Sequence, residues 1–156
     1  MPINFKYRSG LSSVGAYQVS GIPYLSGSDA VIPANSGTPW AVSFPFITQW
    51  VVVENTGANP LRLGFSVHGV KGLSTISGSA GPNATLETNY FVLAPSGSSQ
   101  DRDLSRVKLD VRVKDIYLLG NLAATTTAQI AAGLTGIATE ELTGTRNNWS
   151  GSSGVG

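Results

Sequence analysis

The strongest pattern in the chain is an alternation of apolar and charged residues between positions 106 and 114. The apolar positions are Val107, Leu109, Val111 and Val113, and the charged positions are Arg106, Lys108, Asp110, Arg112 and Lys114. Successive side chains of a β-strand point to opposite faces of its sheet. The pattern therefore predicts one strand with an apolar face on the core and a charged face outside.

The most apolar part of the chain, residues 40–68, predicts two strands joined by a turn. The second strand, 61–68, alternates strictly, with Leu61 and Leu63 on its apolar face. In the first, the apolar residues that share a face are Val42, Phe44, Phe46, Trp50 and Val52. Residues 55–60 between them are rich in Asn, Gly and Pro, which favour turns. We predict a β-hairpin whose apolar face forms the centre of the core, with Trp50 filling that core.

Shorter segments with strand-like patterns lie on both sides of this centre. They are residues 3–7, 14–24 with a bend at 21–23, a short edge at 30–32, and 86–93. Residues 116–119 are apolar on both faces, as expected for a strand covered on both sides. Residues 128–137 contain helix-favouring alanines but also two glycines, and we favour a strand. The total is seven or eight strands and no long helix.

Composition supports an all-β domain. The 156 residues include 19 glycines and 8 prolines, and only 12% are charged, so turn-forming residues outweigh the usual helix formers. A single sheet of this size would leave an apolar face in water, which favours a sandwich of two sheets. We predict one domain over residues 14–142. Residues 1–13 form an N-terminal arm with a short strand, and 143–156 form a Gly/Ser-rich C-terminal arm.

Charge and cysteine content narrow the functional classes. The formal net charge is +1, which gives no electrostatic support for nucleic-acid binding. The chain has no cysteine, so it has neither disulfides nor thiolate metal sites. Polar residues and glycines interrupt the apolar stretch 116–138, and residues 1–6 lack a secretory pattern. We expect a soluble protein without membrane insertion, made in the cytoplasm.

The sequence offers little support for catalysis. His68 is the only histidine, and residues 64–68 lack the closing glycine of a nucleophile elbow, so we interpret His68 as a solvent-facing strand residue. Asp101 and Asp103 are possible oxygen ligands for a cation, but we favour a turn in which nearby arginines balance them. No glycine-rich phosphate-binding motif occurs. We predict no catalytic residue, cofactor or metal, and therefore not an enzyme.

Four segments carry a resemblance to a known family. They are Gly15-Ala-Tyr-Gln-Val-Ser-Gly-Ile-Pro-Tyr24, residues 46–57, residues 113–119 and residues 132–142. Together they resemble the small single jelly-roll capsid proteins of large double-stranded DNA viruses, and most of all the penton proteins of algal and related giant viruses.

The resemblance implies a single eight-stranded antiparallel jelly-roll β-sandwich. It implies a homopentamer that closes the five-fold vertices of an icosahedral capsid. The partners would be further copies of the chain, the major capsid protein and other minor capsid proteins. The protein would be made in the host cytoplasm and reside in the virion, at the capsid vertex.

Aromatic and charged residues are the candidates for contacts between subunits. They are Trp40, Arg106, Lys108, Arg112, Lys114 and Trp149. The charged face of 106–114 either pairs between subunits or is an ordinary solvated face. The alternative function is a carbohydrate-binding, lectin-like β-sandwich, with Trp40 or Tyr24 as the stacking residue and Asp101 or Asp103 near a cation. A small hydrolase with an unidentified pair of acids is the third hypothesis.

Overall fold

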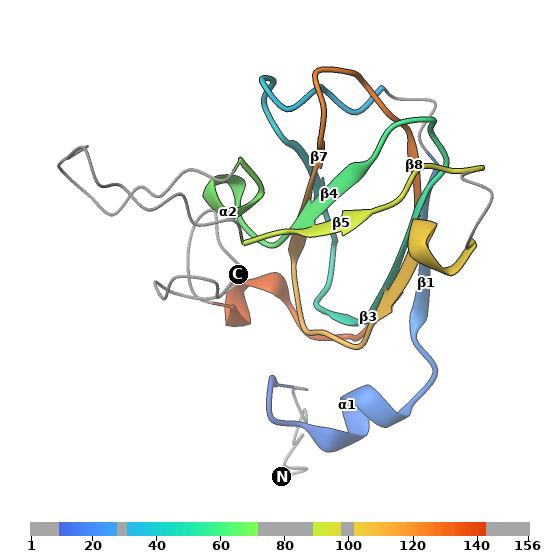
Figure 1. The fold of residues 1–156 in the computed structure, drawn as a ribbon. Coiled ribbons are helices and arrows are strands. Elements are labelled where there is room, and N and C mark those ends of the chain that lie inside the picture. Colours follow the sequence, from blue (N-terminus) through green and yellow to red (C-terminus); the bar gives the residue numbers. More distant parts are fainter. Residues whose placement is uncertain (1–9, 28–30, 72–88, 98–101, 143–156) are drawn as a thin grey trace, which may run out of the picture.

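Two antiparallel sheets of four strands each stack on one another in the computed structural model (Figure 1), which describes residues 10–27, 31–71, 89–97 and 102–142. The strands are β1 (Ile22–Gly27), β2 (Trp40–Ser43), β3 (Thr48–Asn55), β4 (Leu61–Gly64), β5 (Phe91–Leu93), β6 (Arg106–Leu109), β7 (Asp115–Gly120) and β8 (Ala128–Leu134). The short helices are α1 (Val14–Gln18), α2 (Val67–Lys71), η1 (Arg102–Ser105) and η2 (Thr139–Glu141). The predicted all-β sandwich is confirmed. None of the described helices is long and apolar enough to cross a lipid bilayer.

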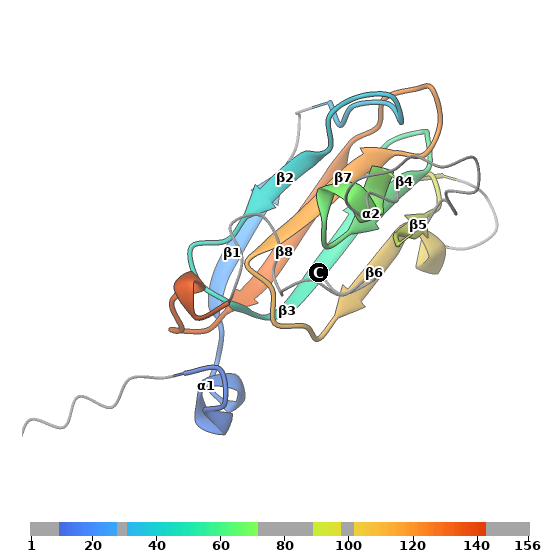
Figure 2. The ribbon, with the colours of Figure 1, turned by 90° about the vertical axis from the view of Figure 1, so that its left-hand side faces the viewer.

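The strand order is β1-β8-β3-β6 in one sheet and β2-β7-β4-β5 in the other. Four of the pairings join the first strand to the eighth, the second to the seventh, the third to the sixth and the fourth to the fifth. The pairs β3·β8 and β4·β7 complete the sheets. Figure 2 shows that β1 and β2 lie on one lateral side of the sandwich, and that β5 and β6 lie on the opposite side.

The predicted central hairpin is wrong, because β3 and β4 belong to different sheets. The loop between them crosses from one sheet to the other and is organised by the buried side chain of Asn55. Its Nδ2 donates to the carbonyls of Asn59 at 2.8 Å and Ala94 at 2.9 Å. Its Oδ1 accepts from the Gly57 N–H at 3.1 Å and the Thr126 hydroxyl at 2.9 Å. This network stabilises the crossover from one sheet to the other, at residues whose composition predicted a hairpin turn.

The predicted apolar face of the first arm is correct only as far as Phe44, before the bend at residues 45–46. Val42 and Phe44 are buried as predicted, but the buried apolar positions that follow the bend are Ile47, Val51 and Val53. Trp50, predicted to fill the core, is only half-buried on the outer face. The chain passes from β2 to β3 in the other sheet here, and the pairing of β3 with β8 shifts register between Thr48 and Trp50. One extra residue exchanges the two faces of a strand.

The core lies between the two sheets, and the pattern at 116–119 is confirmed. Inward-facing Ile116 and Leu118 of β7 belong to the central cluster of buried side chains. Tyr117 and Leu119 point to the opposite face, where they pack against Val70 of α2. A strand that is apolar on both sides therefore has a helix on its outer face.

Two of the predicted strands are in part short helices. The strand over 14–24 is wrong in its first half, because Val14–Gln18 forms α1. The turn before it is closed by the Ser13 N–H on the Gly10 carbonyl at 2.9 Å, and Tyr17 packs beside buried Ile47. The strand over 61–68 ends at Gly64, and the backbone of His68 lies in α2.

The alternating segment 106–114 is not one strand. Its exposure alternates as predicted, but β6 ends at Leu109 and β7 begins at Asp115 in the other sheet. Thr48 binds the crossing chain, because its hydroxyl donates to the Val111 carbonyl at 2.7 Å and accepts from the Val113 N–H at 3.0 Å. A locally regular pattern therefore spans a change of sheet.

The remaining strand predictions have mixed outcomes. The strand over 128–137 is confirmed as β8, which ends at Leu134. Of the edge at 30–32, residue 30 lies outside the described residues, and Ile32 forms a single bridge with Thr126. The strand over 86–93 is present as β5 from Phe91. The strand at 3–7 and the C-terminal arm lie outside the described residues.

Candidate functional site

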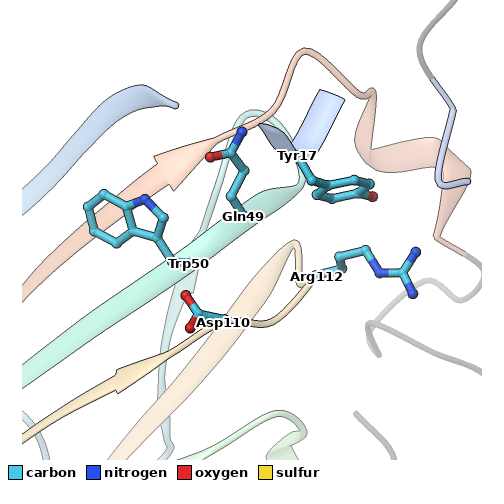
Figure 3. A pocket seen from close by; sticks show the side chains of 5 residues that line it. All are labelled: Tyr17, Gln49, Trp50, Asp110 and Arg112. Atoms are coloured by element: carbon cyan, nitrogen blue, oxygen red, sulfur yellow. The ribbon is translucent and has the colours of Figure 1, made fainter. Parts of the chain in front are cut away.

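A hollow of about 410 Å³ lies on the outer side of the β1-β8-β3-β6 sheet, next to α1. Its lining residues come from α1, β3 and the segment after β6, and they are Tyr17, Gln49, Trp50, Asp110 and Arg112. Figure 3 shows these side chains around a common space, with Trp50 on one side and Tyr17 and Arg112 on the other. The hollow combines two aromatic rings, an amide, a carboxylate and a guanidinium.

The indole of Trp50 rests on a glycine of the neighbouring strand. Gly133 of β8 pairs with Trp50, and a Cβ added at Gly133 would lie 2.6 Å from Cε2 of the indole. Any larger residue at position 133 would therefore displace the ring. The glycine lets the indole lie close to the sheet. The ring is half-buried, and Figure 3 shows it on the side of the hollow opposite Tyr17 and Arg112.

The other end of the hollow is built by contacts to the chain around α1. Gln49 Nε2 donates to the carbonyls of Ala16 at 2.9 Å and Val19 at 3.0 Å. Arg112 Nη1 donates to the Leu11 carbonyl at 2.8 Å, and its Cζ lies 5.5 Å from the centre of the Tyr17 ring. These bonds use side-chain donors of β3 and of the segment after β6 to satisfy carbonyls of a very short helix and its flanks. They hold Gln49 and Arg112 in defined orientations.

Charges of both signs border the hollow. Asp110 pairs with Lys108 at 3.5 Å, and both side chains are largely exposed. The Lys108 ammonium lies 6.0 Å from the centre of the Trp50 ring, at the outer limit of a cation–π contact. An exposed pair of this kind contributes little to stability. The rim therefore offers hydrogen-bonding groups of both kinds without a strong net field.

A second hollow, of about 250 Å³, opens between the edge strands β5 and β6. It is lined by Leu63, Phe65, Asn89, Tyr90, Phe91 and Leu109, and is therefore mostly apolar. Phe91 beside it is 57% exposed and Val92 is 42% exposed. On the opposite lateral side, Leu25 of edge strand β1 is 80% exposed and Ile22 is 48% exposed. Large apolar side chains thus lie in water on both lateral sides of the sandwich.

The residues predicted to make subunit contacts do not form one cluster. Arg106, Lys108 and Arg112 are exposed, and Lys114 is half-buried beside the start of β7. Trp40 packs against the core from β2. Trp149 lies outside the described residues.

The lectin-like alternative named Tyr24 or Trp40 as a stacking residue, and both rings pack against the core. Tyr24 meets Phe44 edge-on, with ring centres 5.0 Å apart. Asp101 lies outside the described residues, and Asp103 falls in η1. Within the described ranges, no three His, Cys, Asp or Glu side chains gather closely enough to hold a metal ion.

Sequence reasoning missed Trp50 as a surface residue. The glycine that makes room for the indole lies more than 80 positions away at Gly133, and only the strand pairing brings the two together. A glycine within an apolar strand was the one signal in the sequence, because such glycines mark close approach of another group.

No protein-family model matches the chain, and no curated protein matches it.

Proposed function

We propose that this chain is a structural capsid protein, a penton that closes the five-fold vertices of an icosahedral virion by assembling as a homopentamer. It acts by self-association and is not an enzyme. The observation that carries the proposal is the exposure of large apolar side chains on two opposite lateral sides of the sandwich. The strand connectivity and the sequence resemblance support it.

The connectivity supports a jelly roll. Pairing first with eighth, second with seventh, third with sixth and fourth with fifth is what results when one long antiparallel hairpin is rolled into two sheets. Viral capsid proteins and lectins both use this architecture. The fold is thus compatible with the capsid role, and the choice between the two rests on the surface.

A closed ring of identical subunits needs two different surfaces on each copy, because its contacts run head to tail. The β1 edge presents the projecting Leu25, and the β5 edge presents Phe91 beside the apolar hollow. These edges lie on opposite lateral sides (Figure 2). Exposed apolar groups of this size mark interaction sites, and an uncovered strand edge also offers backbone hydrogen bonds. We assign the β1 edge and the β5 edge to contact between neighbouring copies.

The proposal also gives roles to two of the predicted contact residues, to the two arms and to the predicted partner proteins. Arg106 and Lys108 on β6 lie at the margin of the β5 edge, where charged side chains border an apolar contact. The arms, residues 1–13 and 143–156, extend the contacts between subunits. The assembled pentamer meets the major capsid protein and other minor capsid proteins in the virion, without contacting nucleic acid or inserting into a membrane.

Native mass spectrometry of the recombinant chain tests this proposal. We expect a species of five subunits, or rings of that size by electron microscopy when the major capsid protein is added. Leu25→Asp and Phe91→Asp each place a charge in the contact and should yield folded monomers. Leu122→Asp is the matched control, because Leu122 is 49% exposed in the loop between β7 and β8, away from both edges. A wild-type chain that stays monomeric in both settings contradicts the proposal.

The C-terminal arm has its own test. A chain lacking residues 144–156 should fold with an unchanged circular dichroism spectrum and should assemble less completely than the full chain. Full assembly of the shortened chain would remove that arm from the subunit contacts.

A further inference from the structure

The hollow at Trp50 is suited to binding a ligand, and none of its lining residues is assigned above to contact between copies. One side of it is the indole of Trp50, which lies against Gly133, opposite Tyr17 and Arg112 (Figure 3). A flat aromatic surface of this kind packs against the flat, apolar C–H face of a sugar ring. Aromatic rings also supply contact area at little cost in side-chain entropy.

The rim supplies the polar groups that sugar hydroxyls need. Asp110 contributes carboxylate oxygens as acceptors, and Lys108 contributes an ammonium donor at the same edge. Both donors of Gln49 Nε2 are used by the carbonyls of Ala16 and Val19, so its Oε1 remains as an acceptor. Figure 3 shows that oxygen on the side toward Trp50. Hydroxyls both donate and accept, which matches a rim of mixed donors and acceptors.

The arrangement is also held in place before a ligand arrives. The indole is fixed by its contact with Gly133, and Gln49 by two hydrogen bonds to the chain around α1. Arg112 is held by the Leu11 carbonyl. Groups that are already oriented lose less entropy on binding, so a shallow site gains affinity from them.

Size and charge select the ligand class. A volume of about 410 Å³ is near the lower end for small-molecule sites and suits one or two sugar rings. A purely apolar ligand would leave the rim groups without partners, and the Lys108–Asp110 pair lowers the attraction for a simple anion. We propose that this hollow binds a short saccharide, stacked on Trp50 and hydrogen-bonded by Asp110 and Gln49.

The test begins with the full recombinant chain on an array of mono- to tetrasaccharides of neutral hexoses, N-acetylhexosamines and uronic acids. The strongest binder is then titrated by calorimetry. Trp50→Ala should weaken its binding by about tenfold or more, because the stacking surface is lost. Trp50→Phe keeps a ring and should recover most of the affinity. Trp40→Phe is the matched control and should bind as the wild type, because Trp40 packs against the core.

Gly133→Ala gives an independent variant. It keeps the indole but places a methyl group where the ring lies, so binding should fall by a similar factor. A second measurement uses the wild-type chain alone. In ¹H–¹⁵N spectra, the saccharide should shift the indole N–H signal of Trp50 and not that of Trp40. Melting curves establish that each variant is folded.

Two results would overturn the proposal: no saccharide on the array bound at millimolar concentration, or unchanged binding by folded Trp50→Ala and Gly133→Ala. Neither result bears on ring assembly. Native mass spectrometry of Trp50→Ala should show the same subunit number as the wild type.

Discussion

The outer faces of the two sheets differ in how far they are buried. On the β2-β7-β4-β5 sheet, Val70 of α2 covers Tyr117 and Leu119, so the outer side of β7 is buried. On the β1-β8-β3-β6 sheet, Trp50 and Val52 of the equally apolar β3 are only half-buried. The same kind of strand is interior in one sheet and surface in the other. The difference arises from where α2 packs, which closes the outer side of β7 and leaves the outer side of β3 partly open.

Both helices are held by apolar packing and hydrogen bonds, but in different proportions. α2 contributes the fully buried Val70, and Arg62 of β4 adds a hydrogen bond of 3.3 Å to the Val70 carbonyl and a cation–π contact with Tyr90 at 4.4 Å. None of the residues of α1 is buried, and Gln49 and Arg112 hold it and the preceding turn by hydrogen bonds. Apolar packing closes a surface, whereas hydrogen bonds at a helix margin leave a hollow beside it.

The largest change in the free energy of unfolding is expected on the outer side of β7, which α2 covers. Leu119→Ala removes a side chain that is 0% exposed beneath α2, and the free energy of unfolding should fall by about 2–5 kcal/mol. Val52→Ala, on the open face, should lower it by about 1 kcal/mol or less, because part of that side chain already lies in water. Urea denaturation of both variants measures the difference. Equal losses would mean that the two outer faces are not distinct.

The next effect concerns the close approach at Gly133. Gly133→Ala forces the indole of Trp50 away from the sheet and should lower the free energy of unfolding by about 1–3 kcal/mol. Gly27→Ala is the control on the edge strand of the same sheet, because an added Cβ there meets nothing within 4 Å. Its effect should stay within about 0.5 kcal/mol. An unchanged free energy of unfolding in Gly133→Ala would show that the indole has room to move.

A smaller, local effect is expected from Gln49→Ala. The variant removes both donors to the carbonyls around α1 and should lower the free energy of unfolding by about 1–2 kcal/mol. Hydrogen exchange should quicken at the amides of Val14–Gln18 and stay unchanged in β8. Gln129→Ala, at an exposed position of β8, is the control and should alter neither quantity. Unchanged exchange in α1 would assign its anchoring to the packing of Ala16 and Tyr17.

The smallest effect should come from the charged rim. Lys108→Ala removes an exposed ion pair with Asp110, and the free energy of unfolding should change by less than about 0.5 kcal/mol. Added salt should have little further influence on either protein. A loss above about 1 kcal/mol, seen in urea titrations at low salt, would assign a structural role to the rim of the hollow.

Several features of the fold were predictable from local patterns. Alternation at 106–114, burial on both faces at 116–119 and the strand at 128–134 follow from side-chain period and apolar content. The crossover that replaces the hairpin predicted for residues 40–68 was not predictable. It depends on hydrogen bonds from Asn55 to the carbonyls of Leu93 and Ala94, at the end of β5. The candidate site was missed for the same reason, since one side of it joins Trp50 to Gly133.

The sequence by itself determined that this protein is an all-β sandwich, because the alternation of apolar and polar residues and the abundance of turn formers act over a few neighbouring positions. Tertiary structure alone decided which strand pairs with which, where the chain changes sheets, and which tryptophan faces water. Those outcomes depend on contacts between distant residues. Trp50 lines a surface hollow because a glycine from β8 lies beneath it and because α2 packs on the other sheet.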